Sequence, residues 1–381
     1  MNGFPVHEAD LTRLAVAGRH RALVLPRGID FASNDYLGLA GSEDLRRAVS
    51  AALTRGVPVG SGGSRLLRGN HPEHEALEAE AAAFFGSGAA LYFSTGYAAN
   101  AALLATLPQR GDLVIHDVLI HASAHEGLRL GRAEARAVAH NDVAAIAAAI
   151  DGWRDRGGTG RAWIAVESLY SMDGDQAPLV ELAALADRHD AVLLIDEAHA
   201  TGVFGPHGRG LAAALQGRDN IITLHTCGKA MGGEGALVCG HRTVIDFLVN
   251  RGRGFIFSTA PSPLMAAAMR QSLRLIAEEA PRRRLQGLID AAGALLSARL
   301  EVARTGSQIV PVILGDDART MAVATALQSA GLDVRGIRPP TVPTGTARLR
   351  LSLTLNIDMA GVEAMVAALA PLLAADRERV G

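Results

Sequence analysis

Asp196 and Lys229 each follow an apolar, strand-like run in the middle of the sequence. Asp196 closes the run 191–196, and Lys229 comes 33 residues later (229 minus 196), just after the run 221–226. One strand–helix–strand unit fits between them, so both side chains should reach the same edge of a parallel sheet, where open α/β folds bind ligands. Pyridoxal phosphate needs a lysine amine that bonds to its carbonyl carbon and a carboxylate that keeps its ring nitrogen protonated. Either residue alone would be read as a helix cap or a surface lysine, but the pair predicts a pyridoxal-phosphate site.

Two better-known motifs are matched only in part. Residues 196–199 read Asp-Glu-Ala-His, as in some helicases, and Gly-Lys at 228–229 resembles part of a phosphate-binding P-loop. A P-loop requires Gly at position 223 and Ser or Thr at 230, where this chain has Thr223 and Ala230. The chain also lacks the HExxH pattern of zinc proteases and the GxSxG pattern of serine hydrolases. The P-loop interpretation therefore fails, and we expect no metal site.

Two further segments contain candidate ligand contacts. Ser-Thr-Gly-Tyr at 94–97 follows a strand-like run and opens the helical pattern 98–107, and free N–H groups at a helix N-terminus favour a phosphate dianion. The same segment could equally be an ordinary strand–helix turn. His121 could stack on a planar ring, although a lone histidine is more often structural. The glycine-rich loop 60–64 could let a ligand approach the backbone closely, but by itself it is a weak signal.

The composition is that of an ordinary globular protein. The chain has 381 residues, of which 49% are hydrophobic and 20% charged, and its formal net charge is -2. This charge gives no reason to expect a nucleic acid or an anionic membrane as a partner. The arginine run 282–284 follows acidic residues and a proline, which predicts the solvated start of a helix. Neither a membrane span nor a secretory signal is apparent, and Cys227 and Cys239 form no disulfide framework, so we expect a cytoplasmic protein.

Short apolar runs alternate with helical patterns from about residue 87 to 240. The central runs, such as 192–195, are continuously apolar, as expected for strands that helices cover on both faces. The strand candidates are residues 89–94, 113–116, 135–139, 162–167, 191–196, 221–226 and 236–239. This alternation predicts an α/β domain with a largely parallel sheet.

The helix that follows the glycine loop can be predicted in detail. Asn70 is the expected N-cap, Pro72 lies in the first turn, and Glu73 stands three residues after the cap, as in a capping box. Gly86 is the expected C-terminal stop, because glycine readily adopts the left-handed conformation that ends helices. The pattern therefore predicts a helix over 71–85.

The last third of the chain has a different pattern. A long helical pattern runs from about 263 to 304, followed by a strand at 308–314, a helix at 320–330, and a final strand and helix. This order predicts a smaller α+β domain. The predicted divisions are an N-terminal arm that belongs with the small domain at 1–38, a large cofactor-binding domain at 39–262, and the small domain proper at 263–381.

Together these segments resemble the α-oxoamine synthases, a family of fold-type-I pyridoxal-phosphate enzymes. The resemblance spans nearly the whole chain, and Ser-Met-Asp-Gly-Asp at 171–175 is shared across the family. The loop 60–64 and the stretch 337–350 look specifically like the oxononanoate synthases of biotin synthesis. The other matching segments are 33–39, 121–123, 196–202 and 226–229. The resemblance implies a mostly parallel seven-stranded sheet in the large domain, a smaller α+β domain, and a homodimer with its active site at the subunit interface.

The resemblance also implies a role for individual residues toward the cofactor. Lys229 would bond to the cofactor, Asp196 would pair with its ring nitrogen, and His121 would stack on its ring, which reverses the structural interpretation of that histidine. His199, aided by Ser171, would bind its phenolic oxygen. The residues implied to hold the phosphate are Thr95, Gly96, Tyr97 and Thr226, with Ser258 and Thr259 reaching the cofactor of the neighbouring subunit.

Substrate contacts follow from the same resemblance. Arg350 would bind the amino acid carboxylate, because a planar guanidinium matches a carboxylate better than a lysine does. Asn34 and Thr341 would lie near the substrates. Relatives carry an arginine near the acyl chain in the N-terminal segment, where this chain matches poorly, so Arg19 and Arg21 both stay open as candidates.

The implied reaction joins L-alanine to pimeloyl-CoA, or to pimeloyl carried on acyl carrier protein, with release of carbon dioxide and 8-amino-7-oxononanoate. Sibling reactions that use glycine or serine with another acyl-CoA are alternatives, since residues 65–68 vary within the family. An aminotransferase or aldolase of the same fold would turn over without a thioester. A nucleotide-binding protein without catalysis would have no need of Lys229.

Overall fold

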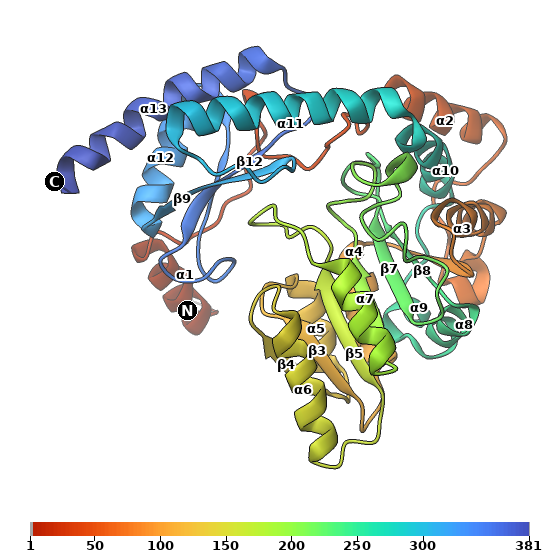
Figure 1. Cartoon of the computed structure of the whole chain (residues 1–381). Coiled ribbons are helices and arrows are strands. Elements are labelled where there is room, and N and C mark those ends of the chain that lie inside the picture. Colours follow the sequence, from red (N-terminus) through yellow and green to blue (C-terminus); the bar gives the residue numbers. More distant parts are fainter. Residues whose placement is uncertain (1–2, 381) are drawn as a thin grey trace.

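The computed structural model describes residues 3–380, and its largest element is a seven-stranded sheet in the order β2-β8-β7-β6-β5-β3-β4 (Figure 1). The strands are β2 (Ala89–Phe93), β3 (Leu113–Asp117), β4 (Glu134–Val138), β5 (Ala162–Glu167), β6 (Val192–Asp196), β7 (Ile221–Thr226) and β8 (Ala236–Gly240). Strand β8 runs antiparallel to both of its neighbours, and the other pairings are parallel. The predicted α/β fold with a largely parallel sheet is confirmed. Both ends of each predicted strand agree with the observed ends to within one residue.

Helices cover both faces of this sheet, which explains why its central strands are continuously apolar. In β6, Val192 and Leu194 face one helical layer, and Leu193 and Ile195 face the other. The first layer consists of α4 (Gly96–Thr106), α5 (Ala122–Leu130), α8 (Arg242–Arg251) and α9 (Arg253–Ile256). The second layer consists of α6 (Val143–Asp155) and α7 (Leu179–Arg188). Successive side chains of a strand alternate between faces, so burial on both sides leaves no polar position in the run.

Near the β2–β8 side of the sheet, α3 (Pro72–Phe85) packs against α10 (Pro263–Ala277), which also packs against α2 (Glu43–Thr54).

The predicted cap of α3 is wrong by one residue. His71 is the extended residue before the helix, and its Nδ1 accepts a hydrogen bond from the Glu73 N–H at 3.1 Å. Asn70 instead donates to Glu75 Oε1 at 2.7 Å. The predicted stop is confirmed, because Gly86 has a φ of 74°.

The C-terminal part forms a three-stranded antiparallel sheet in the order β11-β12-β9. Its strands are β9 (Ile309–Gly315), β11 (Arg335–Ile337) and β12 (Ala347–Ser352). Its helices are α11 (Glu279–Leu300), α12 (Asp317–Ser329) and α13 (Met359–Val380).

The single long helix predicted from 263 to 304 is wrong, because Glu278 is extended and separates α10 from α11. The arginine run 282–284 does lie at the solvated start of a helix, since Arg283 pairs with Glu279 at 3.1 Å.

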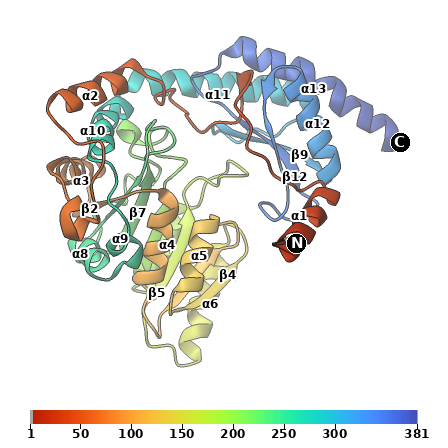
Figure 2. The same ribbon diagram turned by 180° about the vertical axis from the view of Figure 1, so that it is seen from behind.

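The N-terminal segment lies beside this smaller sheet (Figure 2). Strand β1 (Ile29–Asp30) pairs in parallel with β10 (Leu332–Asp333), whereas helix α1 (Pro5–Val16) has no buried residue. Two short helical turns, at Arg65–Gly69 and Pro206–Gly208, complete the elements of the described part. The pairing of β1 with β10 brings the N-terminal arm to the small domain, and the domain limits themselves stay a prediction.

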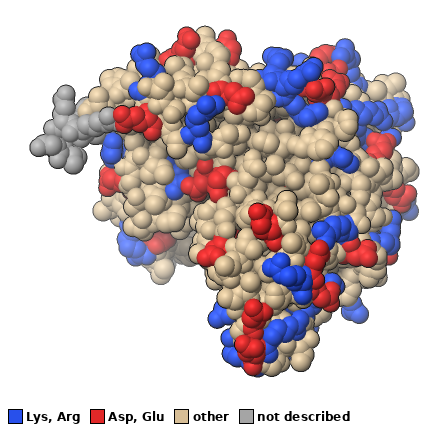
Figure 3. All heavy atoms as spheres, viewed as in Figure 1, with Lys and Arg blue, Asp and Glu red and all other residues tan. Residues whose placement is uncertain are grey.

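The surface agrees with the low net charge. On the face drawn in Figure 3, acidic and basic side chains are interspersed and do not form a patch of one sign. Within residues 3–380, no helix combines the length and the apolar character that crossing a membrane would require.

Candidate active site at the carboxyl edge of the sheet

A cavity of about 290 Å³ opens where β6 and β7 end. Asp196 is the last residue of β6, and Lys229 follows the end of β7 by three residues (229 minus 226). The lining residues are Thr95, Gly96, Tyr97, Asn100, His121, Ser123, Glu167, Asp196, Ala198, His199, Thr226, Gly228, Lys229, Gly233, Glu234 and Gly235. The structure therefore brings together, in one cavity, the two residues on which the sequence prediction depends.

The carboxylate of Asp196 is buried and held from two directions. Asn100, on α4, donates a hydrogen bond to Asp196 Oδ2 at 2.6 Å, and the Ala198 N–H donates to Oδ1 at 2.9 Å. Sequence reasoning missed Asn100, whose only local signal is a polar side chain within a helix that is otherwise apolar. These two donors fix the direction of the carboxylate, which is what a partner for a ring nitrogen requires.

Lys229 is partly buried, and the removal of its ammonium from water is the main reason why its pKa falls to about 8. The carboxylates of Asp196 and Glu167 oppose that shift, and the Arg350 guanidinium adds to it. Lys229 Nζ lies 2.7 Å from His199 Nε2. A lysine that is partly neutral near neutral pH can act as a nucleophile or a base. Lys229 is also the only lysine in the sequence, because the other 36 of its 37 Lys and Arg residues are arginines (37 minus 1).

Lys229 is the end of a hydrogen-bonded chain that reaches the smaller sheet. His199 Nδ1 lies 2.6 Å from the Tyr36 hydroxyl, which lies 3.0 Å from Asn34 Oδ1 and 3.4 Å from Arg350 Nη2. Burial lowers the pKa of His199 well below its ordinary value, so its ring is neutral. The sequence prediction named Asn34, His199 and Arg350 but not Tyr36, although Tyr36 lies inside the matching segment 33–39.

The N-terminus of α4 forms a second wall of the cavity. Thr95 is the N-cap of this helix, and its hydroxyl accepts a hydrogen bond from the Ala98 N–H at 3.0 Å. A side chain at Gly96 would not fit, because a Cβ atom there would lie 2.6 Å from the Thr226 methyl group. Thr95, Gly96, Tyr97 and Thr226 thus line one wall of the cavity beside the start of α4, where free N–H groups suit a phosphate.

The donor set as a whole fits pyridoxal phosphate. The cavity contains an amine whose charge is disfavoured, a firmly held carboxylate, a neutral imidazole beside the amine, and a helix N-terminus at its wall. These are the groups that the aldehyde, the ring nitrogen, the phenolic oxygen and the phosphate of that cofactor require.

His121 stands between this cavity and a second one of about 440 Å³. It caps α5 by accepting a hydrogen bond from the Ser123 N–H, and its Nδ1 lies 2.7 Å from the Ser123 hydroxyl. Burial lowers the pKa of His121. The second cavity has mostly apolar walls, with Ser171 and Thr341 among its polar residues. The structure thus places Ser171 and Thr341 beside His121, in the neighbouring cavity.

Two further ionisable groups lie near this chemistry, because Glu167 lines the first cavity and Arg350 contacts the Tyr36 hydroxyl. Glu167 ends β5 and is in register with Asp196 on the next strand, and burial raises its pKa to about 8. Its Oε1 atom has no hydrogen-bond partner in the described part of the chain. Arg350, on β12, is held by donating to the Ser171 carbonyl at 2.5 Å and to the Ser352 hydroxyl at 2.8 Å. Glu167 was not predicted, although its position at the end of a strand candidate is a usable signal.

Asn34 and Arg350 join the site through Tyr36 without lining either cavity, and four other predicted site residues lie elsewhere. Arg19 pairs with Asp317 at 2.8 Å, and neither it nor Arg21 lines either cavity within residues 3–380. Ser258 and Thr259 also lie outside both cavities, and the Ser258 hydroxyl donates to the Thr259 carbonyl at 3.3 Å. The proposed contacts of these residues with the acyl chain and with a neighbouring subunit stay predictions.

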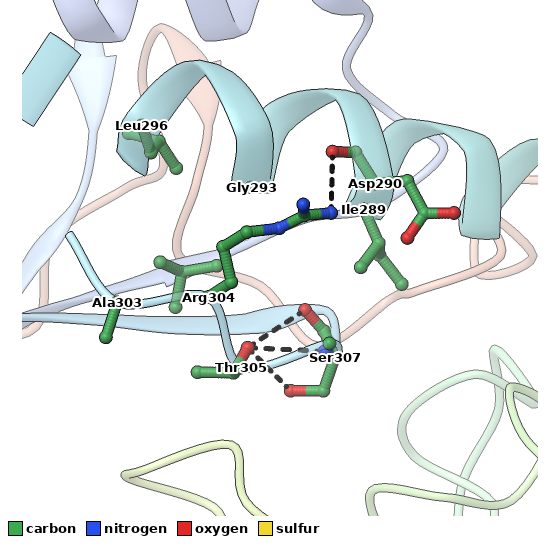
Figure 4. A pocket seen from close by; sticks show the side chains of 10 residues that line it. Ile289, Asp290, Gly293, Leu296, Ala303, Arg304, Thr305 and Ser307 are labelled. Atoms are coloured by element: carbon green, nitrogen blue, oxygen red, sulfur yellow. Dashed lines mark hydrogen bonds between the residues drawn. The ribbon is translucent and has the colours of Figure 1, made fainter. Parts of the chain in front are cut away.

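A separate hollow between α11 and residues 303–307 has no comparable chemistry (Figure 4). Its free volume of about 10 Å³ has room for no more than a water molecule. Its polar groups largely bind one another, as when Arg304 donates to the Asp290 carbonyl at 3.5 Å. Over the described residues, no group of three or more His, Cys, Asp and Glu side chains is arranged to hold a metal ion.

Comparisons with known proteins agree with this geometry. The family model described as aminotransferase class I and II matches residues 26–369. An 8-amino-7-oxononanoate synthase from Anaeromyxobacter dehalogenans is 47% identical over 91% of this chain and 86% of its own length. One from Burkholderia cenocepacia (strain HI2424) is 43% identical over 92% and 89%.

Solved structures with the same fold include a serine palmitoyltransferase from S. paucimobilis, with a TM-score of 0.87, 29% identity and 98% coverage of both chains. An 8-amino-7-oxononanoate synthase from Francisella tularensis has a TM-score of 0.78 and 27% identity, over 93% of this chain and 99% of its own.

Proposed function

Because this chain belongs to the aminotransferase class I and II family, we infer that it is a pyridoxal-phosphate acyltransferase of the α-oxoamine synthase type. It condenses L-alanine with a pimeloyl thioester, carried on coenzyme A or on acyl carrier protein, to give 8-amino-7-oxononanoate and carbon dioxide. The observation that carries this conclusion is the only lysine of the chain, partly buried beside Asp196 with its amine 2.7 Å from His199. An arginine could not replace it, because a guanidinium stays protonated and does not bond to a carbonyl carbon.

The site residues have the following proposed roles toward the cofactor. Lys229 bonds to it covalently, Asp196 pairs with its ring nitrogen, and His199 donates to its phenolic oxygen. His121 covers the ring, and the N-terminus of α4 with Thr226 binds the phosphate. When bound, the cofactor supplies an electron sink that makes a carbanion at the substrate Cα accessible.

The chain's own groups orient the amino acid and move its proton. Arg350 binds the carboxylate of L-alanine, with its guanidinium already oriented by the Ser171 carbonyl and the Ser352 hydroxyl. Lys229 Nζ, freed when the amine of L-alanine takes its place on the cofactor, would remove the Cα proton as general base, and a pKa of about 8 suits that task near neutral pH. His121 polarises the thioester carbonyl, since it stands between the two cavities.

The second cavity is the proposed site of the acyl chain. It lies directly beyond His121, and its walls include Leu119, Ile120, Met172 and Val342, against which methylene groups can pack. Thr341 contributes a hydroxyl to the same cavity. A thioester that entered through this cavity would present its carbonyl carbon to the amino acid beside His121.

A cytoplasmic homodimer is the proposed assembly. Ser258 and Thr259 lie outside the cavities of their own chain, and the neighbouring Phe257 side chain is 73% exposed, which leaves apolar surface for a second subunit to bury. A second copy that covered Phe257 would bring these hydroxyls toward its own cofactor site.

The reaction is tested by the absorbance of wild-type protein and Lys229→Ala, each supplied with pyridoxal phosphate and titrated with L-alanine, glycine and then pimeloyl-CoA. Wild type should gain a visible band and respond to L-alanine, with a further change and product only when pimeloyl-CoA is added. Borohydride reduction should leave the cofactor mass on Lys229. Because the sequence has one lysine, a labelled peptide that contains residue 229 identifies the site, and a label on the N-terminal amine would appear in a different peptide. A response to glycine alone would indicate a sibling reaction, and no bound cofactor in either protein would overturn the proposal.

A further inference from the structure

The Tyr36 hydroxyl has more potential partners than it can use at one time. Its oxygen lies 2.6 Å from His199 Nδ1, 3.0 Å from Asn34 Oδ1 and 3.4 Å from Arg350 Nη2. A hydroxyl has one proton to donate, which can go either to His199 or to Asn34. Because Tyr36 and His199 are both buried, the choice between these partners is made within the protein rather than by bulk water.

The direction of each hydrogen bond follows from what the groups can do. Arg350 only donates, and the side-chain oxygen of Asn34 only accepts. A neutral His199 carries a proton on one ring nitrogen and accepts with the other. Two arrangements of protons are therefore consistent with the contact between Lys229 and His199 and with the three contacts of the Tyr36 hydroxyl.

In the first arrangement, the Lys229 ammonium donates to His199 Nε2. The proton of His199 then lies on Nδ1 and is donated to the Tyr36 oxygen, and the Tyr36 hydroxyl donates to Asn34. This arrangement requires a charged lysine.

In the second arrangement, the Tyr36 hydroxyl turns to His199 Nδ1, its oxygen accepts from Arg350, and the ring proton lies on Nε2. This arrangement requires an acceptor at Nε2, such as a neutral Lys229 amine or a ligand oxygen. Passing from the first arrangement to the second removes one proton, which the Lys229 ammonium gives to water in the cavity. The ring and the hydroxyl keep one proton each.

We propose that Tyr36 is a positioning residue that sets the tautomer of His199, with Asn34 as the partner of its hydroxyl while Lys229 is an ammonium and His199 as the partner once the lysine has reacted. This inference deepens the proposed function and rests on it, because only a bound cofactor oxygen gives the Nε2 proton a catalytic use. It assigns Asn34 a role in the cofactor-free state, in addition to its predicted place near the substrates.

Removal of the hydroxyl has a definite expected effect. In Tyr36→Phe the Nδ1 atom loses its partner in a buried site, and a buried N–H without an acceptor is costly. The Nε2-protonated tautomer leaves only an acceptor unpaired, which buried structures tolerate more often than an unpaired N–H. The variant should therefore hold the Nε2 tautomer whether or not the cofactor is present, with Lys229 as the neutral amine in the cofactor-free state, because an Nε2–H cannot face an ammonium.

The test uses long-range nitrogen–proton NMR on protein labelled with 15N-histidine, with the His199 signals identified by their loss in His199→Asn. Wild type should show the Nδ1-protonated ring when cofactor-free below the pKa of Lys229, and the Nε2-protonated ring when loaded with pyridoxal phosphate. Tyr36→Phe should show the Nε2-protonated ring in both states. Tyr92→Phe is the matched control. Tyr92 is equally buried, but its hydroxyl donates to the Glu234 carbonyl and takes no part in the hydrogen bonds that join Lys229, His199 and Tyr36.

Steady-state kinetics gives a second reading. Tyr36→Phe should lower kcat roughly tenfold, the loss expected for one hydrogen bond, with little change in the KM for L-alanine because Arg350 keeps its contacts with Ser171 and Ser352. One tautomer in both wild-type states, or the same tautomer pattern in Tyr36→Phe as in wild type, would overturn the inference. Absence of condensation with L-alanine in a wild type whose tautomer does change would overturn the proposed function alone.

Discussion

His140 Nε2 lies 2.7 Å from Asp175 Oδ2, and its Nδ1 lies 3.0 Å from Asp117 Oδ2. Asp117 ends strand β3, shortly before His121, and Asp175 closes the 171–175 turn beside the second cavity. Hydrogen bonds to Asp117 and Asp175 raise the pKa of His140 to about 10, so the ring is charged at neutral pH. His140 therefore holds the 171–175 turn against the strand that leads to His121.

The same turn is bound to the smaller sheet as well. Asp173 pairs with Arg348, the Gly174 carbonyl accepts from the Ser307 hydroxyl at 2.8 Å, and the Ser171 carbonyl accepts from Arg350. The 171–175 turn thus joins the large sheet to the strand that carries the proposed carboxylate-binding arginine.

Replacement of His140 by Gln should destabilise the protein in a pH-dependent way. The folded pKa is about 10 and the ordinary value is 6.5, so the stabilisation is fully present below pH 6.5 and is lost as the pH rises through about 10. We expect a difference in unfolding free energy of about 1–3 kcal/mol at the acid end of this window, measured by urea denaturation. His189→Gln is the control, because its Nδ1 lies 3.7 Å from the exposed Asp151. A difference that does not change with pH would contradict a charged His140.

Asn100 should determine how tightly the cofactor binds. Asn100→Ala removes a donor to Asp196, so we expect the dissociation constant for pyridoxal phosphate to rise roughly tenfold, the cost of one hydrogen bond to a charged group. Asn100→Asp should bind more weakly still, because it places a second carboxylate against Asp196. Absorbance titration measures both constants, with Asn250→Ala on the exposed side of α8 as control. Equal affinity of Asn100→Asp and wild type would show that Asp196 is oriented by other groups.

Arg350→Lys should raise the KM for L-alanine by roughly tenfold or more, because a lysine keeps the charge but loses the planar two-point contact with a carboxylate. The effect on kcat should be smaller, since the change affects binding more than proton removal. Steady-state kinetics with varied L-alanine measures both. Arg335→Lys is the matched control, because Arg335 faces Arg350 across the β11–β12 pair and is partly exposed. An unchanged KM would remove Arg350 from the substrate site.

Glu167→Gln should stabilise the cofactor-free protein at alkaline pH. Burial raises the folded pKa of Glu167 to about 8 from an ordinary 4.5, so the folded protein keeps a proton that the unfolded chain releases. Wild-type stability from this group is present below pH 4.5 and is lost as the pH rises through about 8. The unfolding free energy of the variant minus that of wild type should therefore increase from pH 5 to pH 8, as followed by urea denaturation. Glu181→Gln, on the exposed first turn of α7, is the control, and a flat difference would contradict the assignment.

The sequence by itself determined the sheet and the position of its chemistry. Uninterrupted apolar runs such as Val192–Ile195 can be satisfied only where helices cover both faces, so the strands and the largely parallel character of this sheet were predictable from local pattern. The antiparallel direction of β8 was not. The spacing of Asp196 and Lys229 placed both at one edge, because the carboxyl ends of parallel strands share that edge.

Only the tertiary structure decided which groups touch these two residues. Asn100 reaches Asp196 across 96 residues of sequence, and Tyr36 reaches His199 across 163. Such contacts depend on how helices and sheets pack, and periodicity along one element carries no information about them. The pattern also missed the break at Glu278, and it missed the cap at His71, where alternatives one residue apart differ by little free energy. Hydrophobic periodicity therefore specified the layers of this protein, and side-chain packing between distant segments specified its active site.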